Sequence, residues 1–415
     1  MKKRPLLFLG LIVLCSSALS FFQLTRGHVW PDDFAGYLLQ ARSLLTWQMG
    51  DFIRHNAFTL QNSSYPPGPL AYPWGFPLLL APVYAVFGLN PLALKLVGVF
   101  FYVIFLVAFF FLARARLPET ESLLLTGVFS FLPALLAAND LILSDIPFLA
   151  FSTLSLFLIL ELPRRDFRLG IVTGFCIFMA FFLRTNGLLL FAPLLIGLLQ
   201  AFWPHWKIAL RKAAAPLLVF GGLLALQALL LPAGQETYLS HFSMFTLQRL
   251  WENALYYAWL PAWSFDGLPG GAALYPLLAV FLLISLFSHG RRDAALHLYG
   301  LLTVLLFIAW PERQGLRFIY PVLPFLLIGA LDGMLLIVGR LRLGWQKPAL
   351  IAVRGFWGLV LLVCLSVSAA SAYVNMLNGR DINGPFDQYS KQLYAFIREQ
   401  TPENSVIIFM RPRAL

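Results

Sequence analysis

Residues 91–113 read PLALKLVGVFFYVIFLVAFFFLA, an apolar run in which Lys95 is the one charged residue. A helix of roughly 20 apolar residues crosses the hydrocarbon core of a bilayer. Further runs of this kind lie at residues 6–22, 122–138, 146–162, 169–183, 187–203, 213–231, 271–288, 297–310, 320–339 and 355–373. The sequence therefore predicts an all-α polytopic membrane protein with about eleven transmembrane helices.

The composition agrees with this fold class. Of the 415 residues, 60% are hydrophobic and 12% are charged, and the mean hydropathy is +0.77. Soluble domains are closer to half apolar and a quarter charged. The net charge of +11 would suit nucleic-acid binding, but most Lys and Arg residues lie in short loops between apolar runs, as topology signals do. Cys15, Cys176 and Cys364 lie within apolar runs, so neither a disulfide framework nor a Cys-based metal site is expected.

The distribution of charge predicts an orientation. The first span follows Met1-Lys2-Lys3-Arg4, which resembles a signal peptide cleaved after Ser20, but the many later spans favour an uncleaved anchor with a cytoplasmic N-terminus. Three long segments, 23–90, 232–270 and 374–415, then fall on the outer face together with most of the acids. We expect residues 1–373 to form one transmembrane domain in a bacterial inner membrane, with the site and the C-terminus on the periplasmic or extracellular side.

The first outer loop carries an acidic pair, Asp32 and Asp33, at the start of an amphipathic helix. Its apolar residues recur at helical spacing, and we expect the helix to lie at the membrane interface. One carboxylate can cap the helix by accepting backbone N–H groups. The second is left over, and a carboxylate at an apolar boundary can serve as a general base. Both interpretations stay open at this point.

Prolines follow at high density in residues 65–77, where Tyr65, Tyr72 and Trp74 are interspersed. Such a segment cannot form a regular helix and takes a rigid extended path. The apolar run 77–87 is too short to cross a bilayer, so we expect a re-entrant or interfacial helix. The aromatic side chains would either line a substrate site or form an interfacial belt.

Further polar residues gather near the outer ends of the spans. Asp145 precedes Pro147 and either caps a helix or faces a wet cavity. The outer-face cations Lys95, Arg184, Arg313 and Arg317 run against the positive-inside bias, so each needs a carboxylate, a lipid headgroup or a phosphate as partner. No P-loop, dinucleotide fingerprint, zinc signature or nucleophile elbow occurs in the sequence.

Segments in this order resemble motifs of the C-type (GT-C), lipid-carrier-dependent glycosyltransferases, the superfamily of the protein O-mannosyltransferases and the lipid A aminoarabinose transferases. The segments are a first acidic motif at 31–42, a proline-rich motif at 65–77, a second acidic motif at 143–148, and two basic motifs at 184–187 and 317–324. The likeness runs along nearly the whole chain. It implies that residues 1–373 form a transmembrane glycosyltransferase domain.

The resemblance also implies a reaction, the inverting transfer of a sugar from a polyprenyl phosphate to a lipid, glycan or protein acceptor at the outer face. Asp33, with Asp32 as the close alternative, would be the general base, because Tyr37 follows Asp33 at the family's acid-to-Tyr spacing. Asp145 would position the acceptor or the sugar. The donor phosphate would be held by Arg184, Arg313, Arg317 or Lys95. Tyr37, Tyr65, Tyr72, Trp74 and Tyr320 would line the substrate site.

Two departures from the family pattern bear on these assignments. Tyr65 stands where some branches carry a Lys before the Pro-Pro pair, and the acidic pair is Asp-Asp where several branches have Asp-Glu. The expected partners are the lipid-linked donor, the acceptor and membrane lipids, without nucleic acid. No cofactor is required, since the glycosyl phosphate bond supplies the energy, while a divalent metal between Asp32, Asp33 and Asp145 stays open.

Two other classes of function are compatible with many spans. A flippase or other transporter of lipid-linked saccharides would place charges at mid-bilayer, where only Asp332 is expected, and would often show an internal repeat, which is not visible. An O-antigen ligase or polymerase would not require the early Asp pair. In the tail 374–415 we expect a helix ending at Thr401-Pro402 and a strand at 405–410, the start of a small outer αβ domain in a truncated chain.

Overall fold

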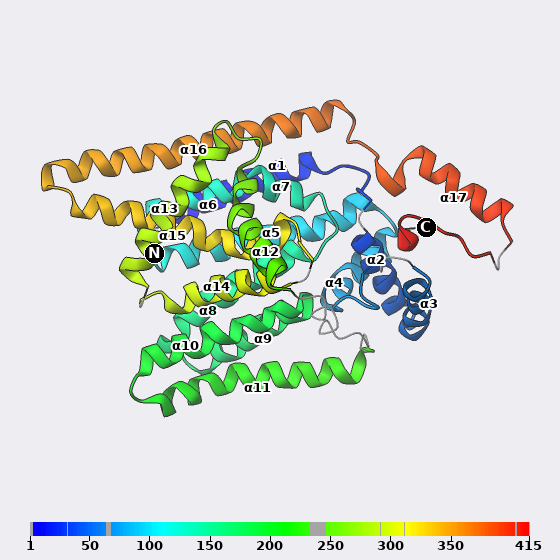
Figure 1. Ribbon diagram of the computed structural model, residues 1–415, viewed down its shortest axis with the longest axis horizontal. Coiled ribbons are helices and arrows are strands. Elements are labelled where there is room, and N and C mark those ends of the chain that lie inside the picture. The colour runs from blue at the N-terminus through cyan, green and yellow to red at the C-terminus, as the bar shows by residue number, and fades with distance from the viewer. Residues whose placement is uncertain are drawn as a thin grey trace.

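The computed structural model describes residues 3–30, 32–63, 68–232, 246–290, 292–310, 312–402 and 405–414. The fold is helical, and the long helices run roughly side by side in one bundle (Figure 1). The α-helices are α1 (Lys3–Gln23), α2 (Asp32–Leu45), α3 (Met49–Gln61), α4 (Gly75–Phe87), α5 (Pro91–Arg114), α6 (Glu119–Phe131), α7 (Pro133–Asn139), α8 (Asp145–Glu161), α9 (Phe167–Leu183), α10 (Phe191–Phe202), α11 (Trp206–Leu230), α12 (Leu247–Trp259), α13 (Gly271–His289), α14 (Ala294–Ala309), α15 (Leu323–Arg340), α16 (Leu343–Leu377) and α17 (Gln388–Gln400). Short 3-10 helices join them, among them η2 (Thr185–Leu190), η5 (Leu316–Val322) and η7 (Pro412–Ala414).

Local signals explain where several helices begin. The Asn90 side chain accepts the backbone N–H of Ala93, and Pro91 follows at the first helical position, so α5 starts there. The Asp387 carboxylate accepts the N–H of Ser390 at 2.7 Å and caps α17 in the same way. These caps satisfy backbone donors that a helix start otherwise leaves without partners.

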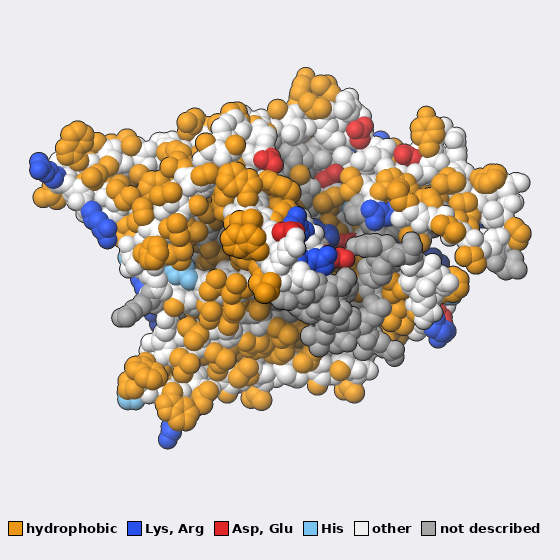
Figure 2. Space-filling view, in the orientation of Figure 1, with side chains coloured by type: hydrophobic (Ala, Val, Ile, Leu, Met, Phe, Trp, Pro, Cys, Tyr) orange, Lys and Arg blue, Asp and Glu red, His pale blue; other side chains and the backbone are white. Residues whose placement is uncertain are grey.

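The chain is an integral membrane protein, as expected. In the described part of the chain, eight helices are long and apolar enough to cross a membrane, and nine if the bent pair α6 and α7 forms one span. The two remaining expected spans, α9 and α14, have 17 and 16 residues. The predicted number of eleven is therefore not confirmed by length and composition alone. Apolar side chains cover most of the bundle's visible side (Figure 2).

Three short helices, α2, α3 and α4, lie at one end of the bundle, on the right in Figure 1. In the predicted apolar stripe of α2, Phe34, Tyr37, Leu38 and Ala41 are buried, Leu44 is half-buried and Leu45 is exposed. The buried part of α2 packs against α4. Gly75 begins α4 against the end of α9, where a Cβ would lie 2.4 Å from the carbonyl oxygen of Phe182. The first loop is thereby fixed directly over the ends of α8 and α9.

The tail corrects one prediction. Residues 405–409 have no regular secondary structure and no strand partner among the residues that the structure describes, so no strand forms there. A single extended segment without a neighbour to accept its hydrogen bonds is not a sheet. The tail is therefore helical, with α17 and η7, and not αβ. After α17 the chain turns back so that η7 packs against α2 (Figure 1).

Candidate active site

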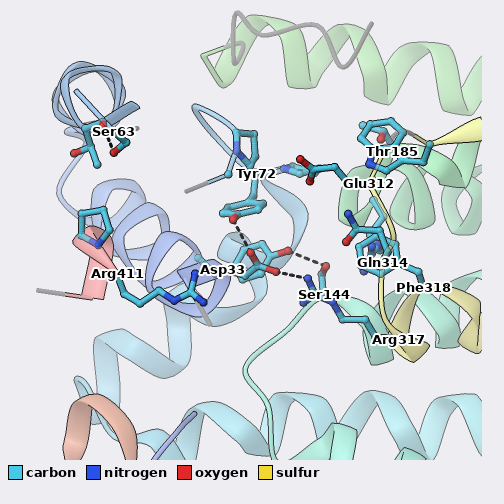
Figure 3. A pocket seen from close by; sticks show the side chains of 18 of the residues that line it. Asp33, Ser63, Tyr72, Ser144, Thr185, Glu312, Gln314, Arg317, Phe318 and Arg411 are labelled. Carbon is cyan, nitrogen blue, oxygen red and sulfur yellow. Dashed lines mark hydrogen bonds and ion pairs between the residues drawn. The ribbon is translucent and has the colours of Figure 1, made fainter. Parts of the chain in front are cut away.

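A cavity of about 1210 Å³ lies where the first loop meets the ends of the long helices (Figure 3). Its polar end contains Asp33, Arg184 and Arg317, and an apolar wall comes from η2, the end of α14 and η5. The opposite wall is made by α3, by residues 68–73 and by residues 406–412. The cavity is thus built from segments that span almost the entire sequence.

Asp33 projects from the first turn of α2 and is contacted by two other segments. Tyr72 Oη donates to its Oδ1 at 2.8 Å, and Arg317 Nη2 donates to its Oδ2 at 2.6 Å (Figure 3). Burial would raise the pKa of Asp33, but the positive charge of Arg317 and the hydrogen bonds from Tyr72 and Arg317 outweigh burial and lower that pKa. Asp33 is therefore an ionised carboxylate held from both sides.

Two arginines converge beside Asp33. Arg184, which follows the last residue of α9, forms an ion pair with Asp145 at the start of α8. Arg317 also approaches Asp145, with 4.0 Å between Nη1 and Oδ2. Both guanidinium groups lie near the Phe318 ring, 4.3 Å from its centroid for Arg184 and 5.0 Å for Arg317. Two cations and two carboxylates therefore form one cluster, in which Asp145 is 6% exposed.

Tyrosine side chains connect this cluster to α2. Tyr37 Oη lies 3.0 Å from Ser144 Oγ, next to Asp145 in sequence, and its ring lies 4.6 Å from the ring of Tyr72. The Gln40 side chain exchanges two hydrogen bonds with the Tyr72 backbone, at 2.9 and 3.0 Å. The extended segment before α4 is thereby fixed on α2, with the Tyr72 hydroxyl directed at Asp33.

The structure brings together part of the predicted site. Asp33, Asp145, Arg184, Arg317, Tyr37 and Tyr72 lie in or beside the cavity. Arg313 does not line it, and instead pairs with Glu252 of α12 at 2.9 Å. The other aromatic candidates point elsewhere, because Trp74 donates to the carbonyl of Pro232 and Tyr320 to that of Ala134. Tyr65 and the side chain of Asp32 lie outside the described residues.

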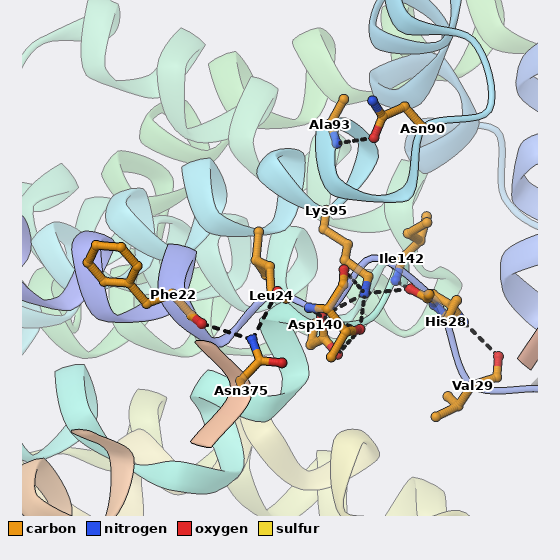
Figure 4. Close-up of polar contacts among 12 residues, drawn as sticks. Phe22, Leu24, His28, Val29, Asn90, Ala93, Lys95, Asp140, Ile142 and Asn375 are labelled. Carbon is orange, nitrogen blue, oxygen red and sulfur yellow. Dashed lines mark hydrogen bonds and ion pairs between the residues drawn. The ribbon is translucent and has the colours of Figure 1, made fainter. Parts of the chain in front are cut away.

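Lys95, another predicted phosphate ligand, does not line the cavity and lies in a separate cluster of polar contacts (Figure 4). Its ammonium group has no exposed surface and contacts four oxygen atoms, the Asp140 carboxylate at 2.6 Å, both oxygens of Thr25, and the carbonyl of Gly27 at 2.7 Å. An ammonium group has three N–H donors, so these acceptors saturate it. Lys95 therefore connects α5 to the first loop and to the turn before α8.

Among the residues that the structure describes, no group of three or more His, Cys, Asp or Glu side chains lies close enough together to hold a metal ion. Asp33 and Asp145 both use their oxygens on guanidinium groups instead. The divalent metal between the three acids stays a prediction, since the Asp32 side chain belongs to it.

Some residues at the site were not anticipated. Gln40 and Ser144 fix the two tyrosines, and Arg413 reaches Tyr72 from the tail. Gln40 lies one helical turn after Tyr37 on α2, so helical periodicity could have placed it on the same face. For Arg413 the sequence holds no such signal.

Comparison with known proteins identifies the fold. No family model matches the sequence, and no curated protein matches it. Among solved structures, the chain is similar to ArnT from Cupriavidus metallidurans bound to undecaprenyl phosphate, with a TM-score of 0.58 and 14% identity over 97% of this chain and 84% of that one. ArnT from the same organism in the apo state gives a TM-score of 0.52 and 13% identity over 88% of this chain and 74% of that one.

The oligosaccharyltransferase from Archaeoglobus fulgidus, in the apo form, gives a TM-score of 0.56 and 12% identity. The match covers 97% of this chain but 59% of that one. The chain therefore shares the fold of ArnT and of this oligosaccharyltransferase, which is the fold that the sequence resemblance implies.

Proposed function

We propose that this protein is a glycosyltransferase that moves a sugar from a polyprenyl phosphate to a hydroxyl group of a lipid, glycan or protein acceptor at the outer membrane face, with inversion. The observation that carries the proposal is the convergence of one carboxylate, Asp33, and two guanidinium groups, Arg184 and Arg317, in a single cavity. The fold shared with membrane glycosyltransferases supports it, although fold alone does not determine activity.

The two walls of the cavity suit two substrates. Leu188 and Leu189 of η2, Leu306 of α14 and Trp310 form an apolar surface next to the arginines, as a prenyl chain attached to a phosphate requires. Undecaprenyl phosphate is the ligand of the similar ArnT structure, which supports a donor of this class. The acceptor would then enter from the side of α3 and residues 406–412, opposite the donor chain.

The chemistry assigns one role to each charged group. The acceptor oxygen attacks the anomeric carbon while Asp33 takes its proton, and the bond between that carbon and the phosphate oxygen breaks. The carrier phosphate leaves as a monoester with one more negative charge than the diester had. Arg184 and Arg317 are placed to stabilise that charge. Asp145, bound to Arg184 and near Arg317, would hold the two guanidinium groups in place.

The decisive experiment compares cells that lack the gene with cells that carry it, by mass spectrometry of surface glycolipids and glycoproteins. A sugar modification should disappear in the deletion strain and return with the wild-type gene. Asp33→Asn should not restore it, although the purified variant should still bind undecaprenyl phosphate. Asp51→Asn, an exposed acid of the same loop on α3, is the matched control and should restore it. Full restoration by Asp33→Asn would exclude Asp33 as the base, and restoration by Asp32→Asn as well would favour a transporter.

A further inference from the structure

Arg413 is a buried arginine in the last turn of the described chain, η7, with 8% of its surface exposed. Among the described residues of the first loop, its guanidinium group contacts Asn56, Pro69 and Tyr72. Nε donates to Asn56 Oδ1 at 2.9 Å, Nη2 to the carbonyl of Pro69 at 2.6 Å, and Nη1 to Tyr72 Oη at 3.2 Å. A cation buried this deeply costs free energy unless its donors find acceptors, and these three contacts use one N–H of each guanidinium nitrogen.

The contact with Tyr72 fixes the direction of the hydroxyl proton. A tyrosine hydroxyl has one proton to donate and accepts through its oxygen. Because Arg413 donates to that oxygen, the proton of Tyr72 is left for Asp33 Oδ1, which lies 2.8 Å away. The Arg413 guanidinium carbon also lies 5.5 Å from the centroid of the Tyr72 ring, a cation–π distance that holds the ring in place.

The space around this contact is closely packed. A Cβ added at Gly36 would lie 2.7 Å from the Tyr72 ring, and one added at Gly68 would lie 3.0 Å from Arg413 Nη1. Gly68 also has a φ of +127°, which side chains rarely adopt. Two glycines thus make room for Tyr72 and Arg413 to meet beside α2.

We propose that Arg413 is a positioning residue of the active site, which orients the Tyr72 hydroxyl toward Asp33 and thereby sets how strongly the base is held. The inference rests on the proposed function of Asp33. It gives the tail a role beyond forming a cavity wall, because docking of η7 against α2 completes the hydrogen-bond chain from Arg413 through Tyr72 to Asp33.

The test measures the protonation of Asp33 itself. Infrared spectra of the purified full chain are recorded across a pH series, and the Asp33 carboxylate band is isolated by subtracting the spectrum of Asp33→Asn. Arg317 and Arg184 also face Asp33, and Tyr37 lies beside it, so all three are left unchanged. Tyr72→Phe should raise the midpoint of Asp33 by roughly one pH unit, because it removes a hydrogen bond to the charged form.

Arg413→Ala should also raise the midpoint of Asp33, because the Tyr72 hydroxyl is no longer oriented toward it. In the double variant Tyr72→Phe/Arg413→Ala, Asp33 should have the same midpoint as in Tyr72→Phe alone. Arg413→Lys, which keeps a charged donor, should raise the Asp33 midpoint less than Arg413→Ala does. If the alanine variant does not fold, Arg413→Gln, which retains an N–H donor, replaces it. Arg398→Ala on the exposed surface of α17 is the control. An unchanged midpoint in folded Arg413 variants, or shifts that add in the double variant, would overturn the proposal.

This readout needs no substrate, so it separates the inference from the proposed function. If Asp33 titrates as expected but no glycan depends on the protein, the proposed function fails and the hydrogen-bond chain stands. If transfer is found but Asp33 does not respond to Arg413, the inference fails. Where both hold, Arg413→Ala should lower kcat and leave the KM for the donor unchanged, since Arg413 does not line the cavity.

Discussion

Asp33 and Arg317 are separated by 284 positions in the sequence, and Arg317 Nη2 donates to Asp33 Oδ2 at 2.6 Å. The pair joins the proposed base to a proposed phosphate ligand, so each charge is compensated before a donor enters. A donor phosphate that takes hydrogen bonds from Arg317 would weaken this pair and make Asp33 a stronger base. Donor binding and activation of the acceptor would thereby be linked through one guanidinium group.

The arginines provide the first prediction. Arg317→Ala and Arg184→Ala should each weaken the binding of undecaprenyl phosphate to the purified protein by roughly tenfold or more, because each removes a charge-assisted hydrogen bond to phosphate. Arg313→Ala is the matched control, since Arg313 pairs with Glu252 outside the cavity. Fluorescence titration in detergent measures the three affinities. If only Arg313→Ala binds undecaprenyl phosphate more weakly, the phosphate does not bind in the cavity.

Asp145 should behave differently from Asp33. Its carboxylate competes with phosphate for Arg184 and Arg317, so Asp145→Asn should bind undecaprenyl phosphate several-fold more tightly. Transfer should nevertheless fall, because the arginines are held less firmly.

Asp33→Asn should reduce transfer by about 10²-fold to 10⁴-fold, the usual contribution of a general base. If Asp145→Asn instead loses as much transfer as Asp33→Asn and binds undecaprenyl phosphate more weakly than the wild type, Asp145 is a direct substrate ligand.

Much of the fold could be predicted because apolar length is a local property. The run 91–113 became α5, Pro91–Arg114, almost residue for residue. Apolar length does not settle the number of spans, since α9 and α14 are shorter than a bilayer-crossing helix usually is. The prediction of a strand at 405–410 was wrong, because a strand needs a neighbouring strand to pair with and local sequence does not show whether one is present.

The site was predictable only as far as residue types and order allow. Asp145, Arg184 and Arg317 could be chosen because charged residues at an apolar boundary need partners. Asp33 is favoured over Asp32 by the acid-to-Tyr spacing of the family that the sequence resembles. Which charges pair is decided by tertiary packing, so Lys95 and Arg313, chosen on the same grounds, proved to have other partners. Tyr72 lines the cavity and also donates its hydroxyl to Asp33, a contact that its aromatic character alone does not predict.

The Lys95 cluster leads to a prediction about stability. Lys95→Met should destabilise the protein by about 3–5 kcal/mol, because it leaves the Asp140 carboxylate without its cation. Lys95→Met/Asp140→Asn should recover much of this loss, since the amide oxygen can still accept the Thr25 N–H and carries no charge. Thermal unfolding in detergent measures both variants.

The same variants test the earlier assignment of Lys95 to the donor phosphate. If Lys95 is structural, the folded double variant should bind undecaprenyl phosphate as the wild type does. Lys391→Met, at an exposed position on α17, controls for the loss of one positive charge. A folded double variant that no longer binds undecaprenyl phosphate would return Lys95 to the phosphate site.

The neutral imidazole of His28 connects the first loop to the turn before α8. Its Nδ1 lies 2.7 Å from the carbonyl of Val29, and its Nε2 accepts the backbone N–H of Ile142 at 2.9 Å (Figure 4). A protonated ring could only donate and would lose the bond from Ile142. Burial, with a contribution from the charge of Lys95, lowers the pKa of His28 to about 4 and keeps the ring neutral.

This shift predicts a pH dependence of stability. Between about pH 6.5 and pH 4 the unfolded chain binds a proton at His28 and the folded chain does not, so folding should lose roughly 1.4 kcal/mol per pH unit as the pH falls through this window. His28→Gln, whose amide can still accept the N–H of Ile142, should lack this component. Thermal unfolding from pH 7.5 to 5 measures the difference, with exposed His205→Gln as control. Equal losses in the wild type and His28→Gln would show that His28 is not the source of the pH dependence and that its pKa is not lowered in the folded protein.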